Sequence, residues 1–83
     1  MYLAWYDPDR RRPAHRKLAD AVAAYTEKFG RTPAQCLTHR QEAEQILATA
    51  DRPSLSIKAV AFVPRNTFYV GESDAEEADA IAA

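Results

Sequence analysis

The sequence has little glycine and almost no cysteine, and each shortage excludes a class of protein. Two glycines in 83 residues leave no glycine-rich loop of the kind that holds phosphates in nucleotide-binding proteins. The lone Cys36 has no partner for an intrachain disulfide, so no covalent cross-link supports the fold. Proteins without disulfides are typical of a reducing compartment, and we therefore expect a cytoplasmic location.

Long apolar runs are also missing. No run approaches the ~20 residues that a membrane-spanning helix needs. The apolar residues 1–6 run directly into Asp7 and Asp9 without a preceding basic stretch, which is unlike a signal peptide. We expect no membrane partner.

The composition that remains is that of a short globular chain. A hydrophobic fraction of 47% and a charged fraction of 28% predict one folded domain over residues 1–83. A chain of this length buries only about 60–65% of the surface that its unfolded state exposes. Pairing with a second copy would add buried area, so we expect a homodimer.

Hydrophobic spacing predicts the order strand, helix, strand, helix, strand, strand, helix. The clearest element is a helix over 14–29, because Leu18, Val22, Tyr25 and Phe29 fall on one stripe of a 3.6-residue period. A second helix is expected to start at a Thr38–Gln41 capping box and to run to about Ala50. A third helix is expected over the acidic segment 73–83, which can fray at its end. The expected strands cover 2–6, 35–38, 55–63 and 67–70.

This alternation predicts an α/β fold, with α+β as the alternative, in which helices pack on one four-stranded mixed sheet. We expect the strand order 2-1-3-4. The first two strands would be parallel neighbours, and the last two would form a hairpin around Pro64-Arg65-Asn66. The residues Val60–Val63 are apolar on both faces of the expected third strand, which indicates either burial on both sides or a bulge.

The two halves of the chain carry opposite charge, and this is the main functional signal. Residues 1–40 hold eight basic and four acidic residues, whereas residues 41–83 hold three and eight. Such a split favours a small binding module, not an enzyme, that associates with itself by facing a basic patch to the partner's acidic segment. The alternative is nucleic-acid binding through the basic segment, whose members are Arg10, Arg11, Arg12, Arg16 and Lys17. Trp5 or Tyr6 could then stack on a base.

A second alternative is a phosphate-ligand binder or small enzyme. In open sheets, ligands favour the carboxyl ends of the strands, and polar side chains follow the first two strands there: Asp7, Asp9, Arg10, Arg11, Arg12 and His39. We expect no metal and no cofactor, because Cys36 and His39 point to opposite faces at a spacing of three and too few ligands exist. Cys36 is expected to be a small buried apolar residue.

Overall fold

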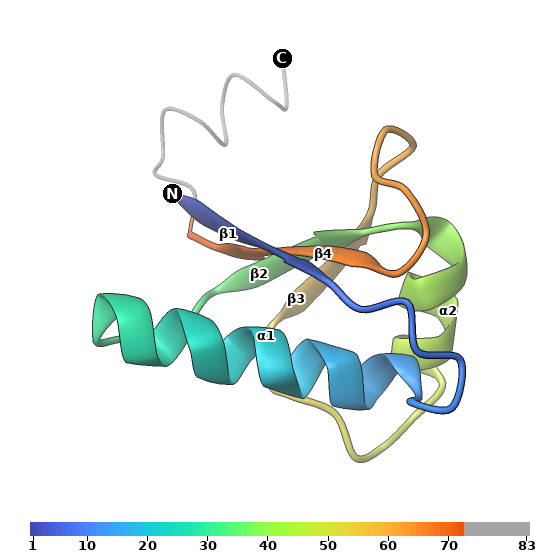
Figure 1. The fold of residues 1–83 in the computed structure, drawn as a ribbon, viewed down its shortest axis with the longest axis horizontal. Helices are drawn as coiled ribbons and strands as arrows, with labels where there is room; N and C mark the ends of the chain where they lie inside the picture. The colour runs from blue at the N-terminus through green and yellow to red at the C-terminus, as the bar shows by residue number, and fades with distance from the viewer. Residues whose placement is uncertain (73–83) are drawn as a thin grey trace.

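The computed structural model describes residues 1–72, which form four strands and two helices in an α+β arrangement (Figure 1). In chain order these are β1 (Tyr2–Tyr6), α1 (Ala14–Phe29), β2 (Gln35–Thr38), α2 (Arg40–Leu47), β3 (Ser56–Ala59) and β4 (Thr67–Gly71). The mixed four-stranded sheet with packed helices confirms the fold class expected from the sequence. The expected acidic helix at 73–83 lies outside the described residues.

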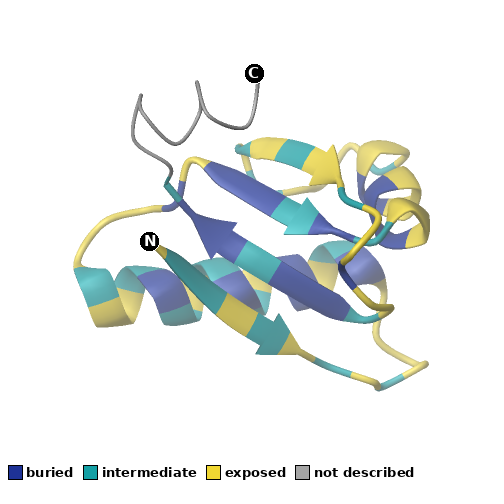
Figure 2. Ribbon diagram, turned by 90° about the horizontal axis from the view of Figure 1, so that it is seen from above, coloured by how far each residue is buried: buried dark blue, intermediate teal, exposed yellow. Residues whose placement is uncertain are grey.

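The strand order is β1-β4-β2-β3, so the predicted order 2-1-3-4 is wrong. β4 lies between β1 and β2 and is antiparallel to both, while β3 pairs parallel with β2. The expected hairpin of the last two strands does not form, and β1 lies at an edge of the sheet. The reason lies in burial, because no residue of β4 is exposed, whereas β1 and β3 both carry exposed positions (Figure 2). The centre of a sheet buries more surface than its edge, and β4 and β2, the two strands without an exposed residue, occupy it.

The hydrophobic core lies on the face of the sheet that the helices cover. Leu18 and Tyr25 of α1 and Ile46 of α2 pack there with Cys36, Phe68 and Val70 of the central strands. Full burial of one such side chain stabilises the fold by about 1.5–3 kcal/mol. The core thus joins both helices to β2 and β4.

Helix α1 has the bounds that its hydrophobic stripe predicts. Leu18 and Tyr25 are fully buried, and Val22 and Phe29 pack against the core at its margin. The helix ends at Gly30, whose φ of 75° is the left-handed conformation that glycine adopts without strain. One charged residue, Lys17, is buried beside this stripe with only 3% of its surface exposed.

Helix α2 and strand β3 are shorter than predicted. The N-cap of α2 is His39, whose Nδ1 accepts a hydrogen bond from the Gln41 backbone N–H at 3.0 Å. The Thr38 hydroxyl donates instead to the Thr67 carbonyl on the neighbouring strand, so the predicted capping box is wrong.

Strand β3 ends at Ala59, and the apolar residues after it form a turn and not a continued strand. Within that turn Val63 is buried, whereas Phe62 is 77% exposed.

Candidate anion-binding site

The carboxyl ends of three strands meet at one edge of the sheet. β1 and β2 both run antiparallel to β4, and β3 runs parallel to β2, so β1, β2 and β3 all end where β4 begins. The first two strands therefore end at the same edge, although β4 separates them. The polar residues that follow them are brought to this edge together with Asn66, which immediately precedes β4.

Asn66 ties three elements together at this edge. Its φ of 61° is a left-handed conformation that asparagine tolerates better than most residues. Its backbone carbonyl accepts from Asp7 N–H at 3.0 Å, and its side-chain Oδ1 accepts from Lys17 Nζ at 3.0 Å. Its backbone N–H donates to Glu42 Oε2 at 3.2 Å. One turn residue thus fixes the exit of β1, the start of α1 and the start of α2.

Glu42 and Lys17 are two buried charges at this edge. Sequence reasoning missed Glu42 and named Lys17 only as a member of the basic segment. Glu42 is 2% exposed, and its Oε1 accepts from Arg65 Nε at 2.8 Å, while His39 Nδ1 lies 3.9 Å from its Oε2. Lysine and glutamate are almost never fully buried unless they are paired. The available signal was weak: Glu42 is the third residue after the N-cap, where a capping-box glutamate belongs.

A cavity of about 370 Å³ opens between the start of α1, α2 and the loop that follows β1. This volume lies within the range of small-ligand pockets. Its lining contains four basic side chains and one acidic side chain: Arg10, Arg12, Lys17, Arg65 and Glu42, with Ala14, Gln45 and Asn66.

Two of the four cations in the lining are already neutralised. Arg12 Nη2 lies 2.7 Å from Asp20 Oδ2, and Arg65 pairs with Glu42. Arg10 and Lys17 have no carboxylate within ion-pair distance among residues 1–72. The cavity therefore keeps two uncompensated positive charges, one of them on a buried ammonium group.

The remaining residues of the sequence-based phosphate site lie outside this cavity. Asp7 Oδ1 accepts from Asp9 N–H, and Asp9 Oδ1 accepts from Arg11 N–H at 2.9 Å. The Arg11 backbone N–H, followed by its side chain, lowers the pKa of Asp9. The Arg11 side chain is 92% exposed, and His39 lines a separate depression beside Val60. Of the six residues named for this site, Arg10 and Arg12 line the cavity.

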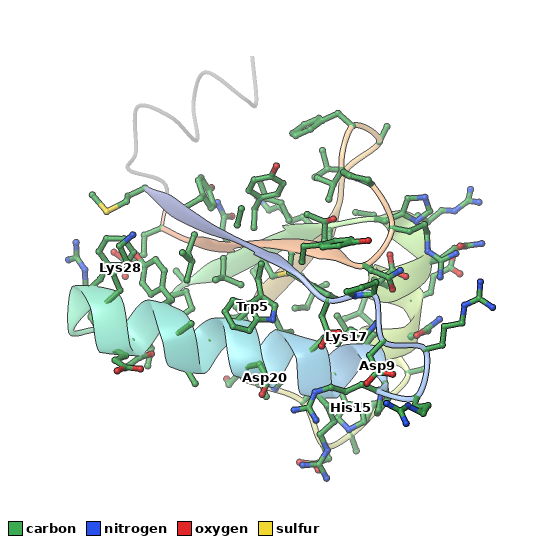
Figure 3. The ribbon with its side chains drawn as sticks, viewed as in Figure 1. Trp5, Asp9, His15, Lys17, Asp20 and Lys28 are labelled. Atoms are coloured by element: carbon green, nitrogen blue, oxygen red, sulfur yellow. The ribbon has the colours of Figure 1, made fainter. Side chains whose placement is uncertain are left out.

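The basic segment does not form a single surface. Lys17 is buried, whereas the four arginines are exposed. Two of these, Arg11 and Arg12, are paired with Asp9 and Asp20. Trp5 packs against the core between β1 and α1, so it is not displayed for stacking, whereas Tyr6 is 66% exposed (Figure 3). Nucleic-acid binding and self-association both stay predictions.

Cys36 belongs to the hydrophobic core. Burial raises the pKa of the Cys36 thiol to about 12, so the thiol is protonated at neutral pH. Within residues 1–72 no three His, Cys, Asp or Glu side chains are grouped so that they could hold a metal ion. In the same part of the chain, no helix is both long and apolar enough to cross a membrane.

No family model, curated protein or solved structure was found to match this chain.

Proposed function

We propose that the protein binds a small dianion, such as a phosphate group, in the cavity between α1, α2 and the loop after β1. The observation that carries this proposal is the pair of unneutralised cations, Lys17 and Arg10, in one cavity. A guanidinium offers a fork of N–H donors, and an ammonium adds a point charge, and phosphate oxygens accept from both. Asn66 and Glu42 hold Lys17 and Arg65 in place and do not themselves attract an anion.

The charge balance supports a dianion over a monocarboxylate. Asp20 pairs with Arg12, whose Nε also lies 3.9 Å from Asp7 Oδ2, and Glu42 pairs with Arg65. Lys17 and Arg10 are then the two cations of the lining without an ion pair among residues 1–72. Because Lys17 is buried, its interaction with an anion is screened less by salt than that of a surface lysine. The ligand that balances both cations without excess charge is doubly negative.

The test is a titration of the full chain with inorganic phosphate at low salt, followed by calorimetry or by amide chemical shifts. We compare Arg10→Gln with Arg16→Gln, since both arginines are exposed and near α1 but only Arg10 lines the cavity. A charge-assisted hydrogen bond is worth about 1.5–3 kcal/mol, so we expect Arg10→Gln to weaken phosphate binding at least about ten-fold. Arg16→Gln should change it little.

Lys17→Met provides the second variant, because methionine keeps the length of the apolar stem and removes the ammonium. Saturable phosphate binding should disappear while Trp5 emission still reports a packed core. The proposal fails if the wild-type chain shows no saturable response to millimolar phosphate. It also fails if Arg10→Gln and Arg16→Gln weaken binding equally, since that result indicates screening by net charge and not a site.

A further inference from the structure

Within the described residues the sheet has two free edges, one at β1 and one at β3 (Figure 2). A free edge strand presents a row of backbone donors and acceptors to which another strand can add, and charged side chains, prolines and bulges normally prevent this. β3 carries Lys58, whereas β1 contains no charged residue, no proline and no glycine. The register between β1 and β4 also runs without a bulge. β1 is therefore the edge without protection against pairing.

Hydrogen bonds at the two ends of β1 show which of its backbone groups face the free edge. Met1 exchanges two hydrogen bonds with the residue that follows β4, and Asp7 N–H donates to the residue that precedes β4 at 3.0 Å. In an antiparallel ladder alternate residues bond to the same neighbour, so residues 1, 3, 5 and 7 bond toward β4. The N–H and C=O groups of Tyr2, Ala4 and Tyr6 point away from it, to the free edge.

The side chains of Tyr2, Ala4 and Tyr6 leave this row of backbone groups accessible. They lie on the face of the sheet that is turned away from α1 and α2, which we call the open face, because Trp5 between them packs against the core. Tyr2 leans over β4, where its hydroxyl accepts a hydrogen bond from the Gln35 side chain. Ala4 is small and exposed, and 66% of Tyr6 is exposed. The outer side of β1 is thus open along its length.

The sequence of β1 has the same pattern in both directions: aromatic, apolar, small, apolar, aromatic. Two antiparallel copies centred on Ala4 place Ala4 opposite Ala4, Leu3 opposite Trp5, and Tyr2 opposite Tyr6 of the second copy. The central residue is one whose backbone groups face the free edge, so the hydrogen bonds form between the same three residues of each copy. Aromatic cross-strand pairs add about 0.2–1 kcal/mol each. The partner that matches this edge is the strand itself.

We propose that two copies of the chain pair their β1 strands antiparallel about Ala4 and so form one continuous eight-stranded sheet from two four-stranded ones. The interface is isologous, and the exposed ring of Tyr6 is covered by Tyr2 of the second copy. It uses backbone hydrogen bonds and no ion pair, unlike the contact between opposite charges that the two halves of the sequence suggest. A strand edge buries less than the roughly 800 Å² per partner of a standard interface, so we expect a weak dimer.

The first test is sedimentation of the full chain over an about hundred-fold range of micromolar concentrations. Ala4→Pro removes a backbone N–H at the free edge, and an edge strand tolerates proline there because the ladder with β4 does not use that group. We expect this variant to raise the dissociation constant of the dimer at least about ten-fold. Trp5 emission shows whether the variant is folded.

Ala59→Pro is the matched control at the other free edge. Residues 56 and 60 donate their N–H groups toward β2, so the N–H of Ala59 between them points away from the sheet in the same way as that of Ala4. The change is chemically identical but lies on β3. It should leave the dissociation constant of the dimer unchanged.

A pair of cysteine variants tests the register without a proline. In a hydrogen-bonded antiparallel pair the two Cα atoms lie about 5.5 Å apart, within the range that a disulfide spans. Mild oxidation should therefore link Ala4→Cys chains into covalent dimers, whereas Ala59→Cys chains should stay unlinked. Cys36 is fully buried and does not take part.

Three results would overturn the proposal. The first is a wild-type chain that stays monomeric over the whole concentration range. The second is an equal loss of dimer in Ala4→Pro and Ala59→Pro, and the third is linkage through Ala59→Cys in place of Ala4→Cys. If Ala4→Pro does not fold, the cysteine variants decide. None of these results bears on phosphate binding, because no residue of β1 lines the cavity.

Discussion

The covered and open faces of the sheet are built from alternate residues of the same strands, yet they differ in how closely they are packed. On the covered face, Phe68 and Val70 of β4 are fully buried against α1 and α2. On the open face, Tyr69 between them is only half-buried. Residues therefore alternate along each strand between the two faces. Substitution by a smaller residue creates a cavity on the covered face and exposes little new surface on the open face. The face that the helices cover therefore contributes most of the buried packing, and the face turned away from them contributes less.

The largest effect should come from comparing adjacent residues on the two faces. Phe68→Ala removes a fully buried ring and should lower the free energy of unfolding by about 3–5 kcal/mol. Tyr69→Ala should cost about 1 kcal/mol, since less of its surface is removed from water. Denaturant unfolding followed by the emission of the single Trp5 measures both.

If Phe68→Ala does not fold, Phe68→Leu replaces it as the milder large-to-small change and should cost more than Tyr69→Ala. Equal losses at 68 and 69 would contradict the difference between the faces.

Most positions on the open face should tolerate substitution, and Gly71 is expected to be an exception. A Cβ there would overlap the Met1 carbonyl oxygen and come within 2.9 Å of Tyr2. The missing side chain also leaves room for the Tyr2 hydroxyl to accept a hydrogen bond from the Gln35 side chain across β4. Gly71→Ala should therefore destabilise the protein by about 1–3 kcal/mol by pushing β1 away.

Gly30→Ala is the matched control, because its φ of 75° is strained for alanine but nothing lies within 4 Å of the added carbon. Its cost should be about 1 kcal/mol. Hydrogen exchange of the β1 amides distinguishes the two variants. The amides should exchange faster in Gly71→Ala, and their exchange rates should be unchanged in Gly30→Ala. A protected β1 in Gly71→Ala would refute the steric explanation.

The effect that is smallest near neutral pH should come from titrating Cys36 on the covered face. Its folded-state pKa of about 12 lies above the ordinary value of 9.0, because burial disfavours the thiolate. The unfolded chain loses its thiol proton first, so stability is fully present below pH 9 and declines as the pH rises toward about 12. Unfolding curves of the wild type and Cys36→Ala between these limits should converge as the pH rises. Parallel curves would contradict burial of the thiol.

The local elements follow from the sequence more closely than their arrangement does. The bounds of β1, α1 and β2 agree with prediction because each is marked by spacing and by breakers such as Pro8, Pro33 and Gly30. The cap of α2 was misplaced by one residue, since both Thr38 and His39 carry a side chain that can accept a hydrogen bond. Strand order was wrong because short strands pair by burial across the whole sheet, which local spacing does not encode.

The candidate site, like the fold, was predicted from the sequence only in its local parts. The sequence by itself determined that basic residues follow β1 and that α1 presents one apolar stripe. Only the tertiary structure decided that Lys17 turns inward, that Glu42 and Arg65 meet across two elements, and that Arg10 faces the same cavity. The physical reason is that propensity, spacing and capping act within about one helical turn, whereas burial of a charge depends on partners supplied by distant segments.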